Sequence, residues 1–501
     1  MQTVDFARKR AQMSPHSLAF EDVVSGRTTT FAQLDERADR FSEALGRLGI
    51  IAGDRIAVSC HNTSVFFELL TACARTGAIL VPLNWRQTPV ELTPIVRECG
   101  AKLLLHDQTT APLATAIAAL LPIARVSFAD FEPLLAEWSG APWTNRAIPA
   151  DRPWYLLCTS GTTGRPKMVI QTAAMTLANY VNVQQPTQLS SYDTSVNFLP
   201  LFHTAGLNLH TLPLLIAGGA SLVLPKFDAE AMIRLLGSGR VTVFFGVPAV
   251  YQAMSLHPDF PSADFSHVRH WGCGGAALHE GLIRTYLDKR ARVCNGMGMT
   301  ETGPTIFFMD QAHAETKIGS VGRSQLLAEV RIVNERGQDV ADGECGELLF
   351  RGPVVTPGYY QDPAATTAAF TPDGWLRSGD VGRRDGDGYY YIVDRIKDMY
   401  ISGAENVYPA EVEAVLMRHP AVLEAVVVGV ADERWGEVGH AAVRLHPEAS
   451  ASEDDIRAFA RENLAAYKVP KYVTFVSDFP RTAAGKVQKT VLRTTLLEIH
   501  A

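Results

Sequence analysis

The sequence predicts an α/β protein with a large N-terminal domain of parallel and mixed βα sheets, a small β-rich subdomain and a small α+β C-terminal domain. Strand-length apolar runs alternate with helical patterns over 25–106, which is typical of βαβ units. Short alternating segments with glycine turns replace that pattern over 319–358. After a charged stretch at 394–398, residues 395–501 resume a βα pattern of their own, which is long enough for a separate domain.

The N-terminal domain opens with a helix that carries its own start and stop signals. Thr30 and Gln33 form a capping box, and the apolar residues that follow keep i, i+4 and i+7 spacing as far as Gly49. Beyond this helix, the alternation of apolar runs and helical patterns predicts a parallel sheet. The expected elements are strands at 55–59, 78–83 and 102–106 and helices at 64–74 and 88–99.

Residues 110–150 interrupt this order with an Ala- and Pro-rich stretch, which we interpret as a variable surface section. The run 154–158 then predicts a short buried strand, followed by a loop and a helical pattern that continues to about residue 183. Further strands are expected at 194–199, 242–246, 268–275, 293–296, 328–334, 346–351, 423–430 and 472–476, and further helices at 409–417 and 452–462.

Composition excludes several classes of protein. At 501 residues the chain exceeds what one hydrophobic core usually supports. A net charge of −7 and a pI near 6.1 argue against a nucleic-acid partner. The seven cysteines are scattered and form no C-x-x-C pair, so they indicate neither a disulfide framework nor a zinc site. Because no apolar run suits a signal peptide or a membrane span, we expect a cytoplasmic protein without a membrane span.

The loop 160–167, with the sequence S-G-T-T-G-R-P-K, carries the strongest functional signal. Its glycines let the backbone approach a ligand closely, its hydroxyls are uncharged donors and Lys167 adds positive charge, which together predict a phosphate cradle. A P-loop would need lysine directly after the second glycine, followed by a hydroxyl residue. Arg165 and Pro166 intervene here and Met168 follows Lys167, so the chain does not match a P-loop NTPase.

This loop resembles the signature of the AMP-forming adenylating enzymes, a superfamily of acyl-CoA synthetases, coumarate-type ligases, luciferases and adenylation domains of peptide synthetases. Further segments resemble that superfamily in the right order, so the resemblance covers essentially the whole chain. These segments lie at 81–86, 200–206, 272–278, 295–301, 377–380, 394–398, 402–409 and 480–487.

The resemblance implies a site for ATP and AMP. Thr300 is implied to contact the α-phosphate and Glu301 to bind Mg²⁺, a hard cation that accepts carboxylate together with phosphate oxygens. Asp380 is implied to take the ribose hydroxyls, because a carboxylate only accepts hydrogen bonds. The implied nucleotide-binding residues are Thr159, Ser160, Gly161, Thr162, Thr163, Gly164, Lys167, Gly274, Gly275, Ala276, Asn295, Gly296, Met297, Gly298, Thr300, Asp380, Arg395 and Lys486.

Adenine recognition departs from the superfamily pattern at one position. Met297 stands where relatives usually carry an aromatic ring that stacks on the base. Because a flexible thioether can also pack on adenine, we expect recognition of the base to be kept. The small residues of 272–278 resemble the segment whose backbone lies against adenine, and they leave space beside the base and the acyl group.

Lys486, in the segment P-R-T-A-A-G-K-V, is implied to neutralise charge between the incoming carboxylate and the α-phosphate. The implied catalytic set is Lys486, Thr300, Glu301 and Lys167. The resemblance further implies a large domain at 1–394 and a mobile small domain at 395–501 that turns about a hinge at Lys397. After that turn, the loop with Ser402, Gly403 and Ala404 would form part of the pantetheine tunnel for coenzyme A.

His203 follows Phe202 at the end of a predicted strand. Isolated histidines between apolar residues are often structural, but the resemblance places this one in the wall of the acyl pocket. The implied pocket residues are His203, Gly206, Asn208, Gly272, Met299, Thr305, Ile306 and Phe307. They include no evident basic residue for a second carboxylate, which favours a hydrophobic monocarboxylic acid. Glycines at 206 and 272 suit a broad, flat group and favour aryl acids slightly over medium-chain fatty acids.

The resemblance thus predicts a carboxylate–CoA ligase that uses ATP, Mg²⁺ and coenzyme A to form an acyl-adenylate and then a thioester. A stand-alone adenylation enzyme that loads a carrier protein would share every motif, and product formation with free coenzyme A separates the two. A luciferase-like oxygenase and a non-enzymatic binding protein with the same fold are further alternatives. The oligomeric state is open, with a homodimer among the options.

Overall fold

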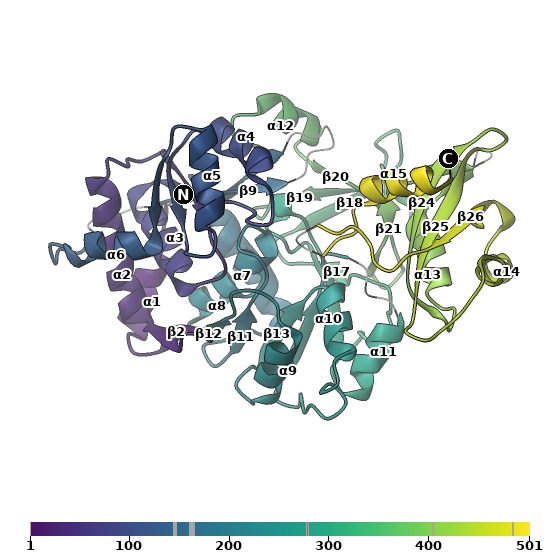
Figure 1. Cartoon of the computed structure of the whole chain (residues 1–501), viewed down its shortest axis with the longest axis horizontal. Coiled ribbons are helices and arrows are strands. Elements are labelled where there is room, and N and C mark those ends of the chain that lie inside the picture. The colour runs from purple at the N-terminus through teal and green to yellow at the C-terminus, as the bar shows by residue number, and fades with distance from the viewer. Residues whose placement is uncertain are drawn as a thin grey trace.

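The computed structural model describes residues 2–143, 148–159, 166–276, 278, 280–402, 405–482 and 485–500 (Figure 1). These residues form a mixed α/β structure with one two-stranded sheet and five larger ones, which confirms the predicted fold class. In the described ranges, no helix is both long and apolar enough to cross a membrane.

Six strands form the largest sheet, in the order β10-β9-β5-β4-β6-β7. Neighbouring strands are parallel except β9 and β10, which form an antiparallel hairpin. The strands are β4 (Arg55–Ser59), β5 (Ile79–Pro82), β6 (Ala101–His106), β7 (Ala124–Ser127), β9 (Pro153–Thr159) and β10 (Lys167–Thr172). The helices of this region are α1 (Phe6–Met13), α2 (Phe31–Arg47), α3 (Ser64–Thr76), α4 (Pro89–Cys99), α5 (Ala111–Leu120), α6 (Phe128–Ala136) and α7 (Ala173–Thr187).

The start of α2 confirms the capping box read from the sequence. Thr30 N donates to Gln33 Oε1 over 2.8 Å, and Gln33 N donates to Thr30 Oγ1 over 3.3 Å. The predicted apolar face is buried as far as Leu45, whereas Leu48 already lies at the C-cap and is exposed. Local signals alone therefore define this helix.

Two expectations in this region were wrong. Residues 110–150 are not only a surface section, because β7 pairs in parallel with β6 and Ala114 and Ile117 of α5 are buried. The alanine-rich composition reflects high helix propensity rather than surface variability. The segment after the phosphate loop first forms β10, and α7 begins only at Ala173.

Two further sheets follow, with the orders β11-β12-β2-β3 and β13-β14-β15-β16-β17. Their strands are β2 (Leu18–Asp22), β3 (Arg27–Thr30), β11 (Thr194–Asn197), β12 (Ala220–Val223), β13 (Val243–Gly246), β14 (His270–Cys273), β15 (Val293–Met297), β16 (Phe307–Phe308) and β17 (Arg323–Ser324). Their helices are η1 (Ala205–Leu209), α8 (Thr211–Ala217), α9 (Ala229–Gly237), α10 (Pro248–Ser255), α11 (Glu280–Asp288) and η2 (Thr300–Thr302). Because β13, β14 and β15 are parallel, their carboxyl ends share one edge, where ligands usually bind.

The β-rich part is one antiparallel sheet in the order β18-β19-β20-β21. Its elements are β18 (Glu329–Val333), β19 (Gly346–Arg351), β20 (Leu376–Arg384), β21 (Tyr390–Arg395) and the helix α12 (Pro363–Ala369). The strands predicted near 328–334 and 346–351 are confirmed, and the sheet continues beyond Gly358 as far as Arg395.

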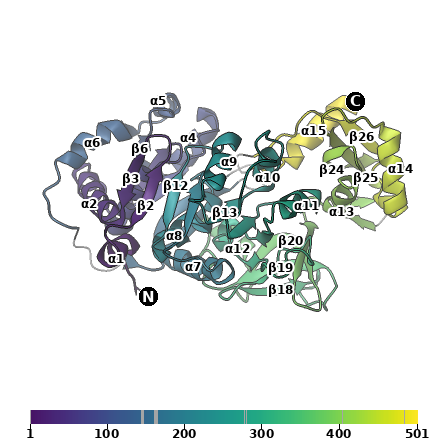
Figure 2. The ribbon, with the colours of Figure 1, turned by 90° about the horizontal axis from the view of Figure 1, so that it is seen from below.

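The last sheet and its helices lie at one end of the molecule, next to α10 and α11 (Figure 2). Its elements are β22 (Tyr400–Ser402), β23 (Glu405–Val407), β24 (Val422–Asp432), β25 (Gly436–Leu445), β26 (Tyr472–Phe475), α13 (Pro409–Leu416), α14 (Glu453–Asn463), η3 (Ala466–Lys468) and α15 (Lys489–His500). The sequence did not predict β25 or α15. The missed β25 lies inside the sheet, with β24 on one side and β22 and β26 on the other.

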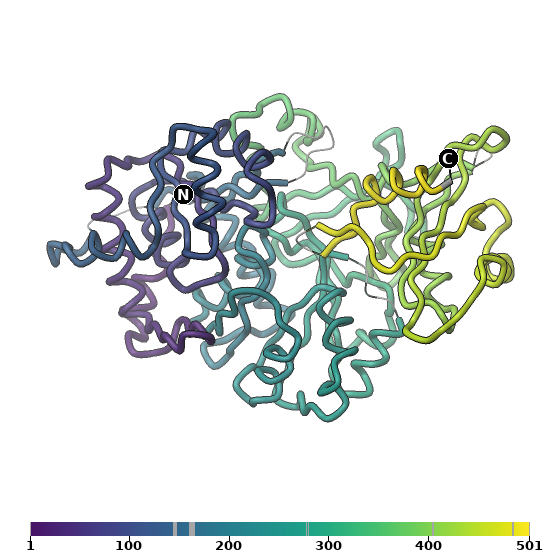
Figure 3. Tube along the Cα trace, in the orientation of Figure 1, coloured from purple at the N-terminus to yellow at the C-terminus, as the bar shows by residue number. Residues whose placement is uncertain are grey.

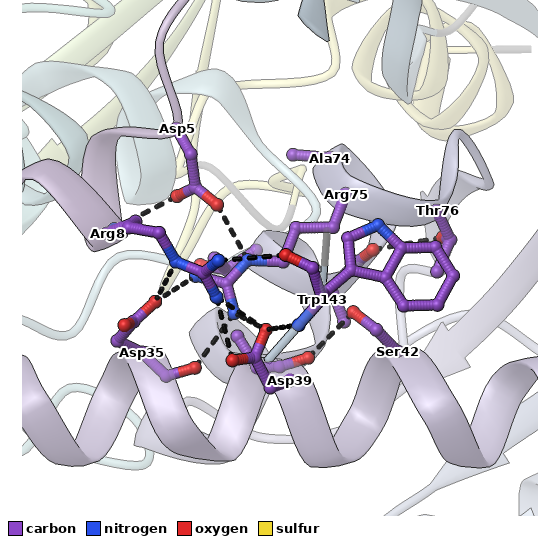
Figure 4. Close-up of polar contacts among 12 residues, drawn as sticks. Asp5, Arg8, Asp35, Asp39, Ser42, Ala74, Arg75, Thr76 and Trp143 are labelled. Atoms are coloured by element: carbon purple, nitrogen blue, oxygen red, sulfur yellow. Dashed lines mark hydrogen bonds and ion pairs between the residues drawn. The ribbon is translucent and has the colours of Figure 1, made fainter. Parts of the chain in front are cut away.

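An ion-pair cluster ties the N-terminal segment to α2 and α3 (Figure 4). Arg75 is 2% exposed and pairs with Asp5, Asp35 and Asp39, and Arg8 also pairs with Asp35 and Asp39. Ahead of this cluster, β1 (Gln2–Thr3) pairs with β8 (Ile148–Pro149). The cluster therefore fixes the start of the chain against the core of the large sheet.

Candidate active site

The chain between β26 and α15 reaches back from the last sheet toward the rest of the molecule (Figure 3). Gly485 packs on α10, because a Cβ placed there would lie 3.5 Å from Ala249 Cβ. The Lys486 side chain lies beside the turn after β14, since a Cβ placed on Gly275 would lie 3.9 Å from Lys486 Cε. The predicted catalytic lysine thus meets the predicted adenine segment.

Lys486 shares an electrostatic environment with four other predicted site residues. Burial lowers the pKa of its ammonium group to about 8. The positive charges of Arg395 and Lys397 contribute to this lowering, while the carboxylates of Asp380 and Glu301 oppose it. The fold therefore gathers residues from β20, β21, the β21–β22 connection and η2 around one lysine of the C-terminal segment.

Glu301 lies on η2, the turn after β15, and is 6% exposed. Burial raises the pKa of its carboxyl group, and a hydrogen bond from Tyr359 and the charges of Lys167 and Arg395 oppose that rise. The Tyr359 hydroxyl donates to Glu301 Oε1 over 2.9 Å. Lys167 Nζ lies 4.8 Å from the centroid of the same tyrosine ring, so two predicted catalytic residues meet at one aromatic side chain. Tyr359 was not predicted as a site residue, because nothing in its local sequence indicates which segments it contacts.

Thr300, the other predicted catalytic residue of η2, is held through its backbone. Gln171 Nε2 donates to the Thr300 carbonyl over 2.8 Å. Thr356 N donates to the Glu301 carbonyl over 2.8 Å. Strand β10 and the segment around Thr356 therefore fix the turn that carries Thr300 and Glu301.

Asp380 and Arg395 face each other in the β20–β21 ladder, where they are register partners. Arg395 Nε lies 3.2 Å from Asp380 Oδ1, and Asp380 is 5% exposed. Burial raises the pKa of Asp380, while Arg395 and Lys486 hold it down. A buried carboxylate of this kind can accept bonds from paired hydroxyl groups, as a ribose would offer.

The carboxyl ends of β14 and β15 approach each other through glycines. A Cβ on Gly274 would lie 2.9 Å from the Gly296 carbonyl oxygen, and a Cβ on Gly298 would clash with the Pro304 carbonyl. These glycines are therefore required by backbone packing. The buried Asn295 Oδ1 has no hydrogen-bond partner among the described residues, so it can accept a bond from a ligand amino group. Met297 packs partly buried against the core of the β-rich sheet.

Some predicted site residues lie outside the described residues. These are Ser160, Gly161, Thr162, Thr163 and Gly164 of the phosphate loop and Gly403 and Ala404 of the predicted tunnel loop. The residues that flank them are described. Thr159 and Lys167 are register partners in the β9–β10 hairpin, so the phosphate loop connects two paired strands. Ser402 is 4% exposed in β22 and pairs with Gly436 of β25.

His203 lies close enough to Lys486 and Arg86 for their charges to lower the pKa of its imidazole. Burial is the larger cause, and the pKa falls to about 4. The buried Nε2 atom has no hydrogen-bond partner among the described residues. A neutral imidazole with an uncommitted nitrogen fits the wall of a substrate pocket better than acid–base chemistry near neutral pH.

A small cavity lies between β11, η1 and β13. Its lining residues are Ser195, Val196, Asn197, Phe198, Leu199, Ala205, Gly206, Leu209, His210, Thr211 and Phe245. These described lining residues include no lysine or arginine. Burial lowers the pKa of His210 to about 4, and His210 Nδ1 lies 3.0 Å from Ser195 Oγ. Phe245 was not predicted as a site residue, although its position near the carboxyl end of β13 could have indicated it.

The structure corrects the reason given for two pocket glycines. A Cβ on Gly206 would lie 2.3 Å from the Pro200 carbonyl oxygen, and a Cβ on Gly272 would lie 2.7 Å from Phe245 Cδ2. The positions that a side chain would fill are thus occupied by a carbonyl group and an aromatic ring. These glycines serve close packing and do not by themselves leave room for a flat substrate.

The remaining predicted pocket residues are bound into the surrounding structure. The Asn208 side chain accepts from Tyr155 over 2.6 Å and donates to Thr204 over 3.0 Å. Ile306 and Phe307 are fully buried in the core of the β-rich sheet. Met299 and Thr305 lie nearby. Met299 N donates to Thr302 Oγ1, and the buried Thr305 Oγ1 has no partner among the described residues.

Comparison with known proteins accounts for nearly the whole chain. Residues 7–360 match the AMP-binding enzyme family, and residues 411–486 match the AMP-binding enzyme C-terminal domain. A feruloyl-CoA synthase from an Amycolatopsis species is 40% identical, with 97% of each chain covered. An indoleacetate–CoA ligase from Aromatoleum aromaticum is 36% identical over 93% of each chain, and a long-chain-fatty-acid–CoA ligase from Mycobacterium tuberculosis is 35% identical over 97% of each.

Solved structures agree with these family matches. ATP-bound MatB from Rhodopseudomonas palustris has a TM-score of 0.90 at 30% identity, with 99% of this chain and 100% of that chain covered. The apo form of the same protein has a TM-score of 0.80 with both chains fully covered. The chain therefore belongs to the family of AMP-binding enzymes and is an AMP-forming acyl-CoA ligase.

Proposed function

We propose that the chain activates a hydrophobic monocarboxylic acid, with aryl acids ahead of medium-chain fatty acids, and transfers the acyl group to coenzyme A. The observation that carries the catalytic proposal is the position of Lys486 over Gly275, beside Asp380 and Glu301. This position brings a positive charge from the C-terminal segment to the predicted nucleotide site. The higher TM-score with ATP-bound MatB than with its apo form supports an arrangement made for the first half-reaction.

In that half-reaction, the substrate carboxylate attacks the α-phosphorus of ATP and pyrophosphate leaves. Lys486 is assigned to neutralise charge on the carboxylate and the α-phosphate, and Lys167 and Thr300 are assigned to the phosphates. Asp380 accepts from the ribose hydroxyls. The rate enhancement then comes from positioning and charge stabilisation, because phosphoryl and adenylyl transfer require little covalent chemistry from the protein.

Glu301 is the proposed protein ligand of Mg²⁺. The described residues contain no group of three or more His, Cys, Asp or Glu side chains arranged for a metal ion. A single buried carboxylate fits Mg²⁺, because this ion keeps several waters and is commonly held by one or two carboxylates together with substrate phosphates. When bound there, the ion would offset phosphate charge.

In the second half-reaction, the predicted tunnel loop has to take the place of Lys486 at the active site. We propose domains 1–394 and 395–501 with a hinge at Lys397, which lies in the connection between β21 and β22. Turning about this hinge withdraws Lys486 and brings the loop with Ser402, Gly403 and Ala404 to the acyl-adenylate. The coenzyme A thiol then displaces AMP, so two closed arrangements serve two reactions.

The proposed substrate class is supported by the small cavity between β11, η1 and β13. Its described lining is mostly apolar, includes no lysine or arginine and offers neutral polar groups at Ser195 and His210. A second carboxylate would therefore lack a cationic partner there. The names of the feruloyl-CoA synthase and the indoleacetate–CoA ligase support an aryl acid, and that of the long-chain-fatty-acid–CoA ligase supports a fatty acid as the second choice without favouring a medium chain.

The cysteines support a reducing setting. All seven are free thiols, and Cys345 is the exposed one. Burial raises the pKa of the Cys99 thiol to about 11 and that of Cys158 to about 12, which keeps both unreactive. We therefore place the enzyme in the cytoplasm.

The deciding experiment measures pyrophosphate release with Mg²⁺-ATP against fatty, benzoic, phenylalkanoic, cinnamic and dicarboxylic acids, each with and without coenzyme A. Release stimulated by one aryl acid class, together with AMP and thioester formed only with coenzyme A, is the expected result. A preference for dicarboxylic acids would overturn the substrate proposal. An adenylate that accumulates and ignores coenzyme A would instead identify a carrier protein as the acceptor.

A further inference from the structure

Tyr359 occupies a segment that is fixed on both sides by backbone contacts. Its backbone forms an antiparallel bridge with Val169 of β10, and the Tyr360 amide donates to the Met168 carbonyl over 2.8 Å. On the other side, Thr356 N donates to the Glu301 carbonyl over 2.8 Å. The segment therefore lies between the strand that begins with Lys167 and the turn that carries Glu301.

The Tyr359 side chain contacts a charged group from each neighbour. Its hydroxyl donates to Glu301 Oε1 over 2.9 Å, and its ring face lies 4.8 Å from Lys167 Nζ. The ring attracts the ammonium group through its quadrupole, and the hydroxyl bond to a carboxylate is charge-assisted. One side chain thus contacts two oppositely charged residues that come from distant parts of the sequence.

This arrangement matters because Glu301 and Lys167 attract each other. Glu301 is buried, and the Lys167 charge already lowers the pKa of its carboxyl group. A nearby cation stabilises the charged form of a buried carboxylate. Without their contacts to Tyr359, Lys167 and Glu301 could pair directly, and neither would then be available to a ligand. The ring offers the ammonium another contact, and the hydroxyl orients one carboxylate oxygen.

We propose that Tyr359 is a positioning residue of the nucleotide site, which keeps Lys167 available to phosphate and Glu301 available to a divalent cation. The inference rests on the proposed roles of those two residues. It adds two separable functions for one side chain. The hydroxyl serves the cation through Glu301, and the ring serves phosphate binding through Lys167.

The test separates the two functions by substitution. Tyr359→Phe keeps the ring and removes the hydroxyl, whereas Tyr359→Leu removes both. Tyr360→Phe is the matched control, because Tyr360 packs on a different apolar cluster in the same segment. Calorimetry measures binding of ATP to the full-length protein, first in EDTA and then over a series of Mg²⁺ concentrations, without any acid substrate. Thermal melting checks that each variant is folded.

For Tyr359→Phe, we expect the ATP affinity in EDTA to be unchanged. The Mg²⁺ concentration that gives half of the maximal gain in ATP affinity should rise about tenfold, which is the scale expected for the loss of a hydrogen bond to a charged group. Tyr359→Leu should in addition weaken metal-free ATP binding about fivefold, on the scale of one cation–π contact. Tyr360→Phe should match the wild type. If Tyr359→Leu does not fold, Tyr359→Phe decides alone, because it retains the packing of the ring.

Equal Mg²⁺ dependence in the wild type and Tyr359→Phe would overturn the inference, as would an equal effect of Tyr360→Phe. Neither result depends on the identity of the acid. If no acid yields a thioester while Tyr359→Phe still shifts the Mg²⁺ dependence of ATP binding, the proposed substrate falls and the role of Tyr359 stands. If thioester forms and the Mg²⁺ dependence is unshifted, only the role of Tyr359 falls.

Discussion

The Lys486 side chain lies beside the turn at Gly275, where a Cβ added to the glycine would be within van der Waals range of Lys486 Cε, at 3.9 Å. The two residues belong to different matched segments of the family, one at the end of the C-terminal match and one in the N-terminal match. Their contact requires that the last sheet stand in one particular position relative to β14. Substitution of Lys486 therefore tests the proposed two-step mechanism, which assigns this lysine to the first half-reaction.

Lys486→Ala should separate the two half-reactions. Adenylate formation, measured by acid-dependent ATP–pyrophosphate exchange, should fall about 10²–10³-fold, as when one preorganised charge-stabilising donor is removed. Conversion of a supplied acyl-adenylate to thioester should remain near the wild-type rate. Lys468→Ala, which removes a lysine paired with Glu411 in the same part of the chain, is the control. Equal loss of both steps would refute the assignment of Lys486 to the first.

The pH dependence of the first step follows from the pKa of the same residue. A lysine is charged below its pKa, and burial lowers that of Lys486 to about 8. Adenylate formation should therefore decline as the pH rises through about 8, while thioester formation from supplied adenylate should not share that decline. Lys486→Arg should abolish the decline in the activity that it retains, because arginine stays charged over this range. A decline that persists in Lys486→Arg would assign the titration to another group.

Much of the fold could be predicted because its signals are local. The α2 capping box and the strands β4 and β19 depend on a few neighbouring residues, and all were predicted within a residue or two. The missed β25 is covered on both faces, with Ala441 and Ala442 belonging to different hydrophobic clusters. A strand buried on both sides shows no alternation of apolar and polar residues, so its sequence lacks the usual signal.

Short motifs in the sequence single out candidate site residues, but they do not show which side chains from distant segments pack beside them. Lys486, Glu301 and Asp380 were identified from the sequence, and the structure brings them together. Tyr359 has no local signature, because its importance arises from the segment that runs beside β10. Gly272 was interpreted as open space, but the Phe245 ring comes from another strand and occupies that position.

Phe245 should control the length of the acids that the pocket accepts. Its ring lines the cavity and covers Gly272, so Phe245→Ala should open space at that point. The ratio of kcat/KM for a longer acid to that for a shorter one should rise about tenfold, on the scale of a methylene-sized change in a hydrophobic pocket. Phe244→Leu, on the opposite face of β13, is the control and should reduce stability without changing the ratio. An unchanged ratio in Phe245→Ala would place the acyl group elsewhere.

The ion-pair cluster at the N-terminus should matter for stability and not for substrate choice. Arg75 is 2% exposed between Asp5, Asp35 and Asp39. Arg75→Met should lower the free energy of unfolding by about 3–5 kcal/mol, because it leaves buried carboxylates without their main cation. Urea unfolding would measure this loss, and adding Asp39→Asn should recover part of it.

The sign of the pH effect on that variant provides a second check. Burial already raises the pKa of Asp39 in the wild-type protein, and removal of Arg75 should raise it further. A carboxyl group whose pKa is higher in the folded than in the unfolded state stabilises the fold as the pH falls. The stability difference between the wild type and Arg75→Met should therefore shrink as the pH is lowered toward about 5. A difference that stays constant on acidification would mean that Arg75 acts through packing and not through charge.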